Sequence, residues 1–267
     1  MRWRASRSRS VRCLTLCTAV ACGTVLVTAA SVGSAAITRH SSLLLPRVSS
    51  TGRPFGGTPA VGALFTVSRS GLGEHFCTAS VVRSTHGDLA VTAAHCVTGG
   101  TTRIAFVPGY ANGRAPYGIW TVTAVYADQA WRSSRDPDDD VAFLRLADAP
   151  DGVPAEDVTG AEKLGTSPRQ PELVQVIGYP DDAREPVWCA NRTKDFSPTQ
   201  LEFDCGGYPQ GTSGGPFLAH VSAATGQGTV VGVIGGYQEG GDTSSVSYAA
   251  DITARVTALY RQAQAAS

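Results

Sequence analysis

The sequence lacks the residue spacings that mark common metal sites. Its seven cysteines and five histidines contain neither a C-x-x-C pair nor an H-x-x-x-H pair. The usual zinc-binding patterns are therefore absent, and we expect neither a metal nor a cofactor. Charged residues are only 16% of the chain, and there is no internal repeat or long low-complexity segment. The chain has 267 residues, of which 42% are hydrophobic. This is enough to bury a sizeable core in one or two compact units.

The first 36 residues have the pattern of a secretory signal peptide. They carry five arginines and no acidic residue, followed by a mildly apolar run over residues 13–32 and by the small residues Ser34-Ala35-Ala36. The Thr, Ser and Gly content makes this run weakly hydrophobic for a stable membrane span, which favours a cleaved signal over an uncleaved anchor. A lipoprotein at Cys22 is less favoured, because only a short apolar stretch precedes it. We predict a secreted protein with no stable membrane association after signal cleavage.

Removal of residues 1–36 changes both the charge and the cysteine count. It leaves 17 basic against 22 acidic residues, a net charge near −5, so there is no electrostatic case for nucleic-acid binding. Four of the seven cysteines remain, and four cysteines in an exported chain predict two disulfides. The count alone allows three pairings among Cys77, Cys96, Cys189 and Cys205.

Short apolar segments separated by glycine and proline turns fill most of the chain, in two sets joined by a polar connector over residues 150–168. Such spacing predicts an all-β barrel or sandwich. The first set of expected strands covers residues 62–67, 76–82, 89–92, 104–107, 119–125 and 141–146, and the second covers residues 173–177, 187–190, 201–205, 217–218, 230–234 and 246–249.

The two ends of the exported chain differ from this pattern. Residues 37–57 are rich in Ser, Arg, Pro and Gly, and we interpret them as an extension or a short pro-segment. Near the C-terminus the apolar residues Val256, Leu259, Tyr260 and Ala263 recur at helical spacing. They predict one amphipathic helix over residues 253–265, packed on the second set of strands.

The stretch from Gly211 to Pro216, with sequence GTSGGP, contains a candidate nucleophile. A serine hydroxyl is a poor nucleophile unless a base takes its proton and donors receive the charge that develops on the attacked carbonyl. Glycines around Ser213 let the backbone turn tightly and free the N–H groups of Gly211 and Ser213 to form such an oxyanion hole.

Two upstream segments supply the expected partners. His95 ends the small-residue run Thr92-Ala93-Ala94, and Asp140 opens the apolar segment that follows it. Histidine is suited to take the serine proton, and a buried aspartate fixes its tautomer. Asp139 is the alternative to Asp140, which we prefer because it directly precedes the strand over residues 141–146.

The nucleophile motif also fits the G-x-S-x-G elbow of α/β-hydrolases, but the order of residues excludes that fold. An elbow is followed by a helix and later by an acid and a histidine. After Ser213 the chain continues with strand-like segments, and the only later histidine, His220, follows with no acid in between.

The order His95, Asp140, Ser213 and the motifs around them resemble the trypsin-like serine protease family, over residues 58–260. The chain is more similar to the secreted bacterial branch, including glutamyl-endopeptidase-like proteins. This resemblance implies two six-stranded antiparallel β-barrels packed together (about residues 58–150 and 165–251), followed by the C-terminal helix. It also implies the disulfides Cys77–Cys96 and, by proximity, Cys189–Cys205. The implied substrates are proteins or peptides, and we expect a monomer.

The chain departs from animal members of the family at the residue before Ser213. Those members have an aspartate there, which pairs with a new N-terminal amine, whereas this chain has Thr212. We therefore expect activity without a free N-terminus docked beside the nucleophile. The alternative function is a catalytically silent binding protein on the same fold.

The resemblance also indicates where a substrate side chain would bind. The implied pocket is uncharged, without the acid or histidine of Arg/Lys- or Glu-specific relatives, although Glu239 and Asp242 lie close to it in sequence. Its residues are Gly207, Tyr208, Ile234, Gly235, Gly236, Tyr237 and Val246.

Overall fold

The computed structural model describes residues 48–98, 103–149, 151–168 and 171–266. The predicted signal peptide and residues 37–47 of the predicted extension lie outside these ranges. None of the helices within the described ranges has the length and apolar character needed to span a bilayer.

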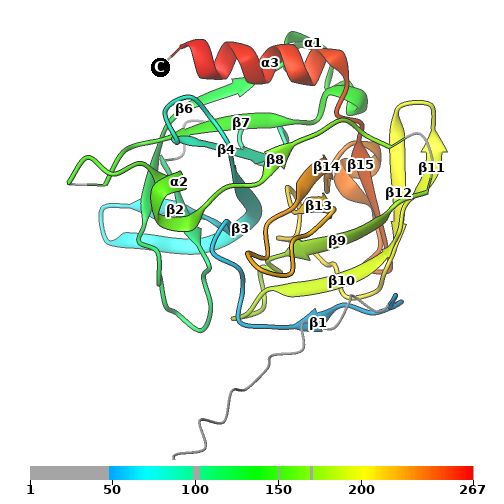
Figure 1. Cartoon of the computed structure of the whole chain (residues 1–267), viewed down its shortest axis with the longest axis horizontal. Coiled ribbons are helices and arrows are strands. Elements are labelled where there is room, and N and C mark those ends of the chain that lie inside the picture. Colours follow the sequence, from blue (N-terminus) through cyan, green and yellow to red (C-terminus); the bar gives the residue numbers. More distant parts are fainter. Residues whose placement is uncertain (1–47, 99–102, 150, 169–170, 267) are drawn as a thin grey trace, which may run out of the picture. The chain divides into compact units, whose positions relative to one another are not determined.

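The first half of the described chain forms a closed six-stranded barrel, as predicted (Figure 1). The strand order is β2-β3-β4-β7-β6-β5, and every pair is antiparallel. The strands are β2 (Val61–Ser68), β3 (Gly71–Val82), β4 (Leu89–Thr92), β5 (Arg103–Pro108), β6 (Trp120–Ala127) and β7 (Ala142–Leu146).

Alternation along these strands divides the barrel's apolar residues between two clusters. Leu64 and Leu144 belong to one cluster, whereas their neighbours Ala63 and Phe143 belong to another that also contains Leu218 and other residues of the second half. Because successive side chains point to opposite faces of a strand, both faces are buried here. The second cluster is the seam between the two halves.

The second half contains two sheets, so the prediction of a second closed, wholly antiparallel barrel is wrong. One sheet has the order β1-β10-β9-β13-β14-β8 and the other β11-β12-β15, and the pair β14–β8 is parallel. The strands are β1 (Arg53–Pro54), β8 (Lys163–Leu164), β9 (Leu173–Gly178), β10 (Val187–Arg192), β11 (Lys194–Ser197), β12 (Gln200–Asp204), β13 (Pro216–Ala219), β14 (Thr229–Val233) and β15 (Val246–Ala250).

The barrel is interrupted because the chain changes partners at two places. β10 leads directly into β11 through the buried Thr193. The two strands nevertheless belong to different sheets, because β10 pairs with β9 and β1 and β11 pairs with β12. β14 meets β15 through the bridge between Ile234 and Ala249 and the hydrogen bond from the Gly235 N–H to the Tyr248 carbonyl (3.0 Å). The hydrogen-bonded ladder is therefore not continuous around the second half.

Both disulfides that the family resemblance implies are present. Cys77 is joined to Cys96, and Cys189 is joined to Cys205. The second of them links β10 to the residue after β12, across the gap in the ladder, and Asn191 adds a hydrogen bond from Nδ2 to the Asp204 carbonyl (2.7 Å). Covalent and side-chain links thus replace backbone pairing at this point.

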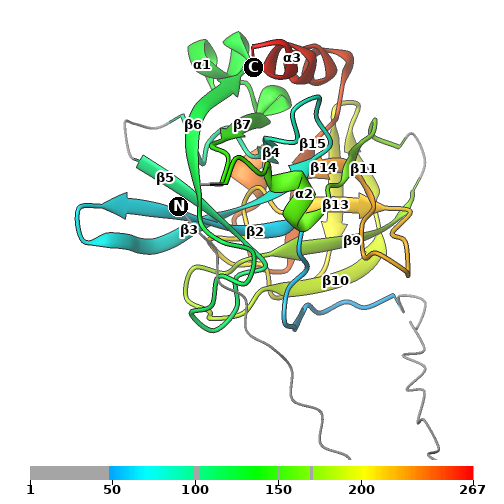
Figure 2. The same cartoon turned by 60° about the vertical axis from the view of Figure 1, so that its left-hand side comes forward.

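The predicted C-terminal helix is present as α3 (Ala254–Ala265), but its main strand contacts are with the first barrel, whereas the sequence predicts that it packs on the second half. It lies against β7 and β6 of the first barrel (Figures 1 and 2), where Tyr260 packs on Phe143. Arg145 of β7 fixes this position, because its guanidinium donates to the carbonyls of Ala263 (2.9 Å) and Ala266 (2.7 Å) at the end of the helix. The remaining helices are α1 (Gln129–Ser134), α2 (Ala155–Thr159) and the short 3₁₀ turns Pro137–Asp139 and Tyr237–Gly240.

A buried carboxyl group lies where the two halves meet. The backbone of Glu162 pairs with β3, donating to the Val81 carbonyl and accepting from the Arg83 N–H (2.9 Å each). Its side chain is fully buried and accepts a hydrogen bond from the Gly228 N–H of the second half (2.5 Å). Burial raises the pKa of Glu162 from 4.5 to about 7.

We expect Glu162 to make the stability of the protein depend on pH. Its folded-state pKa is raised, so the protonated side chain favours the folded state below pH 4.5, and this contribution is lost as the pH rises to about 7. A difference of one pKa unit corresponds to about 1.4 kcal/mol. Relative to Glu162→Gln, the unfolding free energy of the wild type should therefore fall by about 3 kcal/mol between pH 4.5 and about pH 7. Denaturant titration of both proteins at several pH values measures this difference. Parallel stability profiles would contradict it.

Candidate active site

The pairing of β4 with β7 brings the predicted histidine and aspartate together. Thr92, at the end of β4, lies opposite Ala142, at the start of β7. His95 follows the first strand by three residues, and Asp140 precedes the second by two. Since the two strands are antiparallel, both residues emerge at the same end of the barrel.

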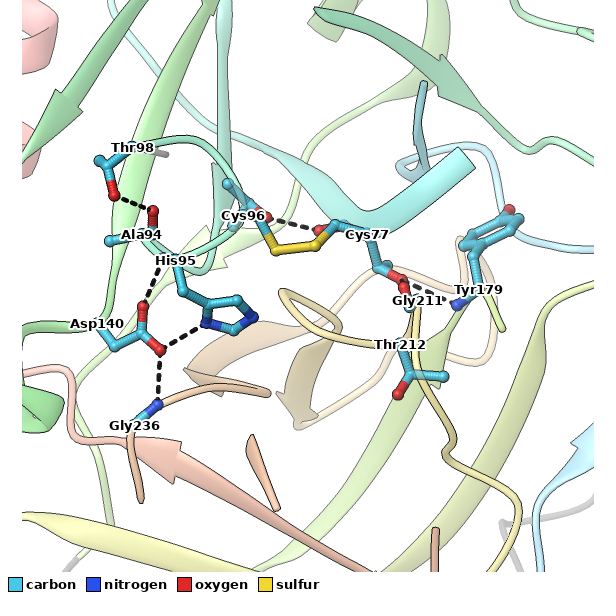
Figure 3. The surroundings of a disulfide bond; sticks show 12 residues. Cys77, Ala94, His95, Cys96, Thr98, Asp140, Tyr179, Gly211, Thr212 and Gly236 are labelled. Atoms are coloured by element: carbon cyan, nitrogen blue, oxygen red, sulfur yellow. Dashed lines mark hydrogen bonds and ion pairs between the residues drawn. A yellow bond between two sulfur atoms is a disulfide. The ribbon is translucent and has the colours of Figure 1, made fainter. Parts of the chain in front are cut away.

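Three hydrogen bonds fix the carboxylate of Asp140 against His95 (Figure 3). Asp140 Oδ1 accepts from the His95 N–H (2.8 Å), and Oδ2 lies 2.7 Å from His95 Nδ1 and accepts from the Gly236 N–H (2.9 Å). Asp140 is fully buried, and the His95 side chain is 11% exposed. A carboxylate only accepts hydrogen bonds, so Nδ1 carries the proton and Nε2 is left as the basic nitrogen.

The neighbouring aspartate faces another part of the molecule. Asp139 Oδ2 accepts a hydrogen bond from Arg255 Nη1 of α3 (2.6 Å). Burial raises the pKa of Asp139, and the nearby carboxylate of Asp128 raises it further, although Arg255 opposes both. Asp140 alone of the two contacts His95, which is the arrangement preferred from the sequence.

The loop that carries Ser213 is held by the first barrel at both ends. The Thr78 N–H donates to the Ser213 carbonyl (2.7 Å), and Thr78 Oγ1 donates to the Gly211 carbonyl (3.1 Å). Gly211 has φ +90°, and a Cβ on it would lie 2.3 Å from the Asp181 nitrogen. Only glycine fits this position, on grounds of both conformation and space.

The two N–H groups predicted to form an oxyanion hole have no partner within the described part of the chain. Neither the Gly211 N–H nor the Ser213 N–H donates a hydrogen bond to any group in that part. Backbone donors without a protein partner beside a nucleophile are available to an oxyanion. Within the same ranges, no hydrogen bond joins Ser213 to His95, and contacts of this kind commonly tighten when substrate binds.

Thr212, at the position where animal family members have an aspartate, makes hydrogen bonds within its own loop. Its hydroxyl donates to the Pro209 carbonyl (2.7 Å), and its N–H bonds the same oxygen (3.3 Å). The residue is 2% exposed and packs against Gly178, where a Cβ would lie 2.7 Å from Thr212 Cβ. The loop is therefore held by neutral contacts.

His95 and Ser213 line one cleft of about 540 Å³. Of the predicted substrate-binding residues, Tyr208 and Ile234 also line it. The other five predicted residues are not among those that line the cleft.

Gly235 and Gly236 lie against the Asp140 carboxylate, where a Cβ on Gly235 would be 2.9 Å from Oδ2. Tyr237 packs against Phe196 with tilted rings and against Tyr248 edge-on, at the surface. Gly207 packs beside Gly52, and Val246 pairs with Asp204 in the sheet β12–β15. These residues support the cleft rather than line it.

Most of the remaining lining was not predicted. The largest part is the loop over residues 238–244, in which Gln238 and Glu239 have positive φ (52° and 53°), a conformation that neither residue type indicates from the sequence. Glu239 and Asp242, noted in the sequence for their charge, both belong to it. The other unpredicted lining residues are Phe76, Cys77, Cys96, Pro209, Gln210 and Thr212.

One group of three potential metal ligands occurs in the described ranges, and it does not form a metal site. It consists of Cys77, His95 and Cys96. The two sulfurs are joined in a disulfide and the histidine is bonded to Asp140, so no thiolate is available to a metal.

The fold agrees with the comparisons to known proteins. The trypsin-like peptidase domain family matches residues 77–233, more than half of the chain, and the protein therefore belongs to this family. No curated protein matches the sequence.

Three solved structures are similar. Protease Anisep from Arthrobacter nicotinovorans shares 24% identity over 80% of this chain and 100% of its own, with a TM-score of 0.67. The thermostable serine protease AL20 from an extremophilic microorganism shares 21% identity over 79% of this chain and 99% of its own, with a TM-score of 0.67. A Glu endopeptidase shares 15% identity over 82% of this chain and 99% of its own, with a TM-score of 0.64. At these identities the likeness shows the fold.

Proposed function

We propose that the protein is a secreted serine endopeptidase that hydrolyses peptide bonds through Ser213, His95 and Asp140. The observation that carries the proposal is the buried Asp140–His95 pair in the cleft that also contains Ser213. The two disulfides and the predicted signal peptide support an extracellular location. The proposed substrates are proteins or peptides, the proposed peptidase domain spans residues 58–267, and the proposed form is a monomer.

The proposed reaction proceeds through an acyl-enzyme. His95 Nε2 takes the proton of the Ser213 hydroxyl as its oxygen attacks the substrate carbonyl, and Asp140 stabilises the imidazolium that forms. The N–H groups of Gly211 and Ser213 receive the charge on the carbonyl oxygen. His95 then gives its proton to the leaving amine, and water releases the acyl group by the same route in reverse.

A serine-reactive sulfonyl fluoride tests this proposal without knowledge of the substrate. We expect stoichiometric labelling at Ser213 in the folded protein, together with cleavage of a denatured protein substrate. Labelling should fail in His95→Ala, because the hydroxyl is no longer activated. If the folded wild type resists the reagent and cleaves no denatured protein, the alternative of a silent binding protein is correct.

We propose that the residue on the acyl side of the scissile bond is uncharged, since Tyr208 and Ile234 are the predicted pocket residues that line the cleft. The carboxylates of Glu239 and Asp242 line the same cleft, and its described lining contains no lysine or arginine. Cationic side chains should therefore be favoured at neighbouring substrate positions.

The double substitution Glu239→Gln with Asp242→Asn should reduce this preference for cationic side chains. Exposed ion pairs contribute about 0.2–1 kcal/mol each, so the loss of both carboxylates should lower kcat/KM about two- to thirtyfold for substrates with lysine or arginine near the scissile bond. Profiling on a mixed peptide library measures the change, with uncharged peptides as the internal control. A dominant Arg/Lys or Glu requirement at the acyl-side position itself would contradict the uncharged pocket.

A further inference from the structure

The segment from Ser49 to Phe55, which the sequence assigns to an extension or pro-segment, lies along the free edge of β10. Arg53 and Pro54 of β1 pair with Trp188 and Val187 (Figure 1). Beyond the paired residues, the Ser49 N–H donates to the Ala190 carbonyl (2.8 Å), and the Phe55 N–H donates to the Pro186 carbonyl (3.0 Å). Backbone hydrogen bonds therefore run along the whole segment, which we call the N-terminal strand.

The N-terminal strand also holds Gly206, seven residues before Ser213. The Gly52 N–H donates to the Gly206 carbonyl (2.7 Å), and the Gly206 N–H donates to the Ser50 carbonyl (2.9 Å). Both backbone polar groups of Gly206 are thus bonded to this one strand. The approach is close, since a Cβ on Gly52 would lie 3.1 Å from the Gly206 oxygen.

Gly206 begins the stretch of chain that ends at the candidate nucleophile. Along this stretch the Tyr208 hydroxyl donates to the Val176 carbonyl (2.7 Å), and the Tyr208 N–H donates to the Ser244 carbonyl (3.0 Å). At the other end the first barrel holds Ser213 through the Thr78 N–H. Residues 206–213 are therefore fixed at both ends, and the N-terminal strand supplies the hydrogen bonds at the first end.

We propose that the N-terminal strand is a permanent positioning element of the mature protein, and that its pairing with Gly206 keeps residues 206–213 in the conformation that presents Ser213 to the cleft. This inference rests on the proposed function. Removing the strand would leave the edge of β10 and both polar groups of Gly206 without their partners. Any processing after export consequently takes place before Ser49. The strand acts through backbone pairing and does not depend on the charge of a terminal amine.

Two versions of the protein, beginning at residues 48 and 58, test the inference. A 1 Å misplacement can lower a rate on the order of 10²-fold, so we expect the shorter version to fold yet to lose at least about tenfold in kcat and in labelling rate. Its KM should change less than its kcat, because Ile234 lies outside residues 206–213 and Tyr208 is also held by the carbonyls of Val176 and Ser244. A synthetic peptide of residues 48–57 should restore activity in trans by adding back the strand. Nα-acetylation of the longer version should leave activity unchanged.

The outcomes separate this inference from the proposed function. If the longer version is folded but inactive and unlabelled, the proposed function fails. If both versions are equally active, the proposed function stands and the inference is wrong. A several-hundred-fold loss on acetylation alone would show that a terminal charge, rather than strand pairing, forms the site.

A pair of point variants decides the question if the shorter version does not fold. Gly52→Pro removes the N–H that donates to Gly206, whereas Gly56→Pro lies just outside the paired segment, at a position where a Cβ meets no atom within 4 Å. We expect Gly52→Pro to lower kcat at least about tenfold relative to Gly56→Pro at equal KM. Equal kcat values in the two variants would overturn the inference.

Discussion

Replacement of Ser213 by alanine is expected to abolish peptidase activity, with a loss of about 10⁶-fold in turnover. The same loss is expected for His95→Ala, because the two residues act as one proton-transfer unit. The double variant should therefore be no worse than either single variant. Initial rates on a denatured protein substrate, with protein concentration matched by folded fraction, measure all three.

Ser244→Ala is the matched control for this series. Ser244 is a second serine that lines the cleft, at the surface of the loop over residues 238–244. Its loss should change turnover by no more than a few-fold. If Ser213→Ala retained wild-type activity, the nucleophile would have to be another residue and the assignment of the site would be wrong.

Asp140→Asn is expected to lower turnover on the order of 10⁴-fold while the protein remains folded. The asparagine can still accept one of the two backbone N–H bonds, but its amide would face His95 Nδ1 and favour the wrong tautomer. The pH profile of kcat/KM separates this effect from a loss of structure, since the surviving activity should depend differently on the protonation of His95.

Asp139→Asn is the neighbouring control, and it should lose far less activity. Its carboxylate bonds Arg255 of α3 rather than His95. Comparable losses in the two variants would show that the effect of Asp140→Asn comes from disruption of the loop between α1 and β7. In that case Asp140 would not have the proposed role in orienting the histidine.

The parts of the molecule that the sequence predicts are those set by local pattern or by motif. The strands of the first barrel follow from short apolar segments and regularly spaced turns, and their closure into a barrel is what the family resemblance implies. The contact between Asp140 and His95 follows from the order of two motifs and is present, and Thr212 bonds the Pro209 carbonyl within its own loop. In each case the informative residues lie within a few positions of one another.

The parts that the sequence does not predict depend on contacts between distant segments. The second barrel is interrupted because β10 pairs with residues more than a hundred positions earlier, and nothing near β10 indicates that partner. The helix α3 packs on the first barrel because Arg145 bonds its last carbonyls. The cleft wall over residues 238–244 turns at Gln238 and Glu239 in a conformation that those residue types rarely adopt.

Each end of the described chain packs on the half that is farther from it in the sequence. Residues 49–55 complete a sheet of the second half, whereas α3 covers the first barrel. The first barrel therefore cannot cover its apolar surface from its own continuous stretch of sequence. The face of the first barrel that α3 covers stays exposed until the last residues of the described chain are available, so complete folding has to wait for the C-terminal segment. Unfolding should accordingly be a single cooperative transition of both halves, and a chain cut in the connector over residues 150–168 should yield two fragments that regain structure only together.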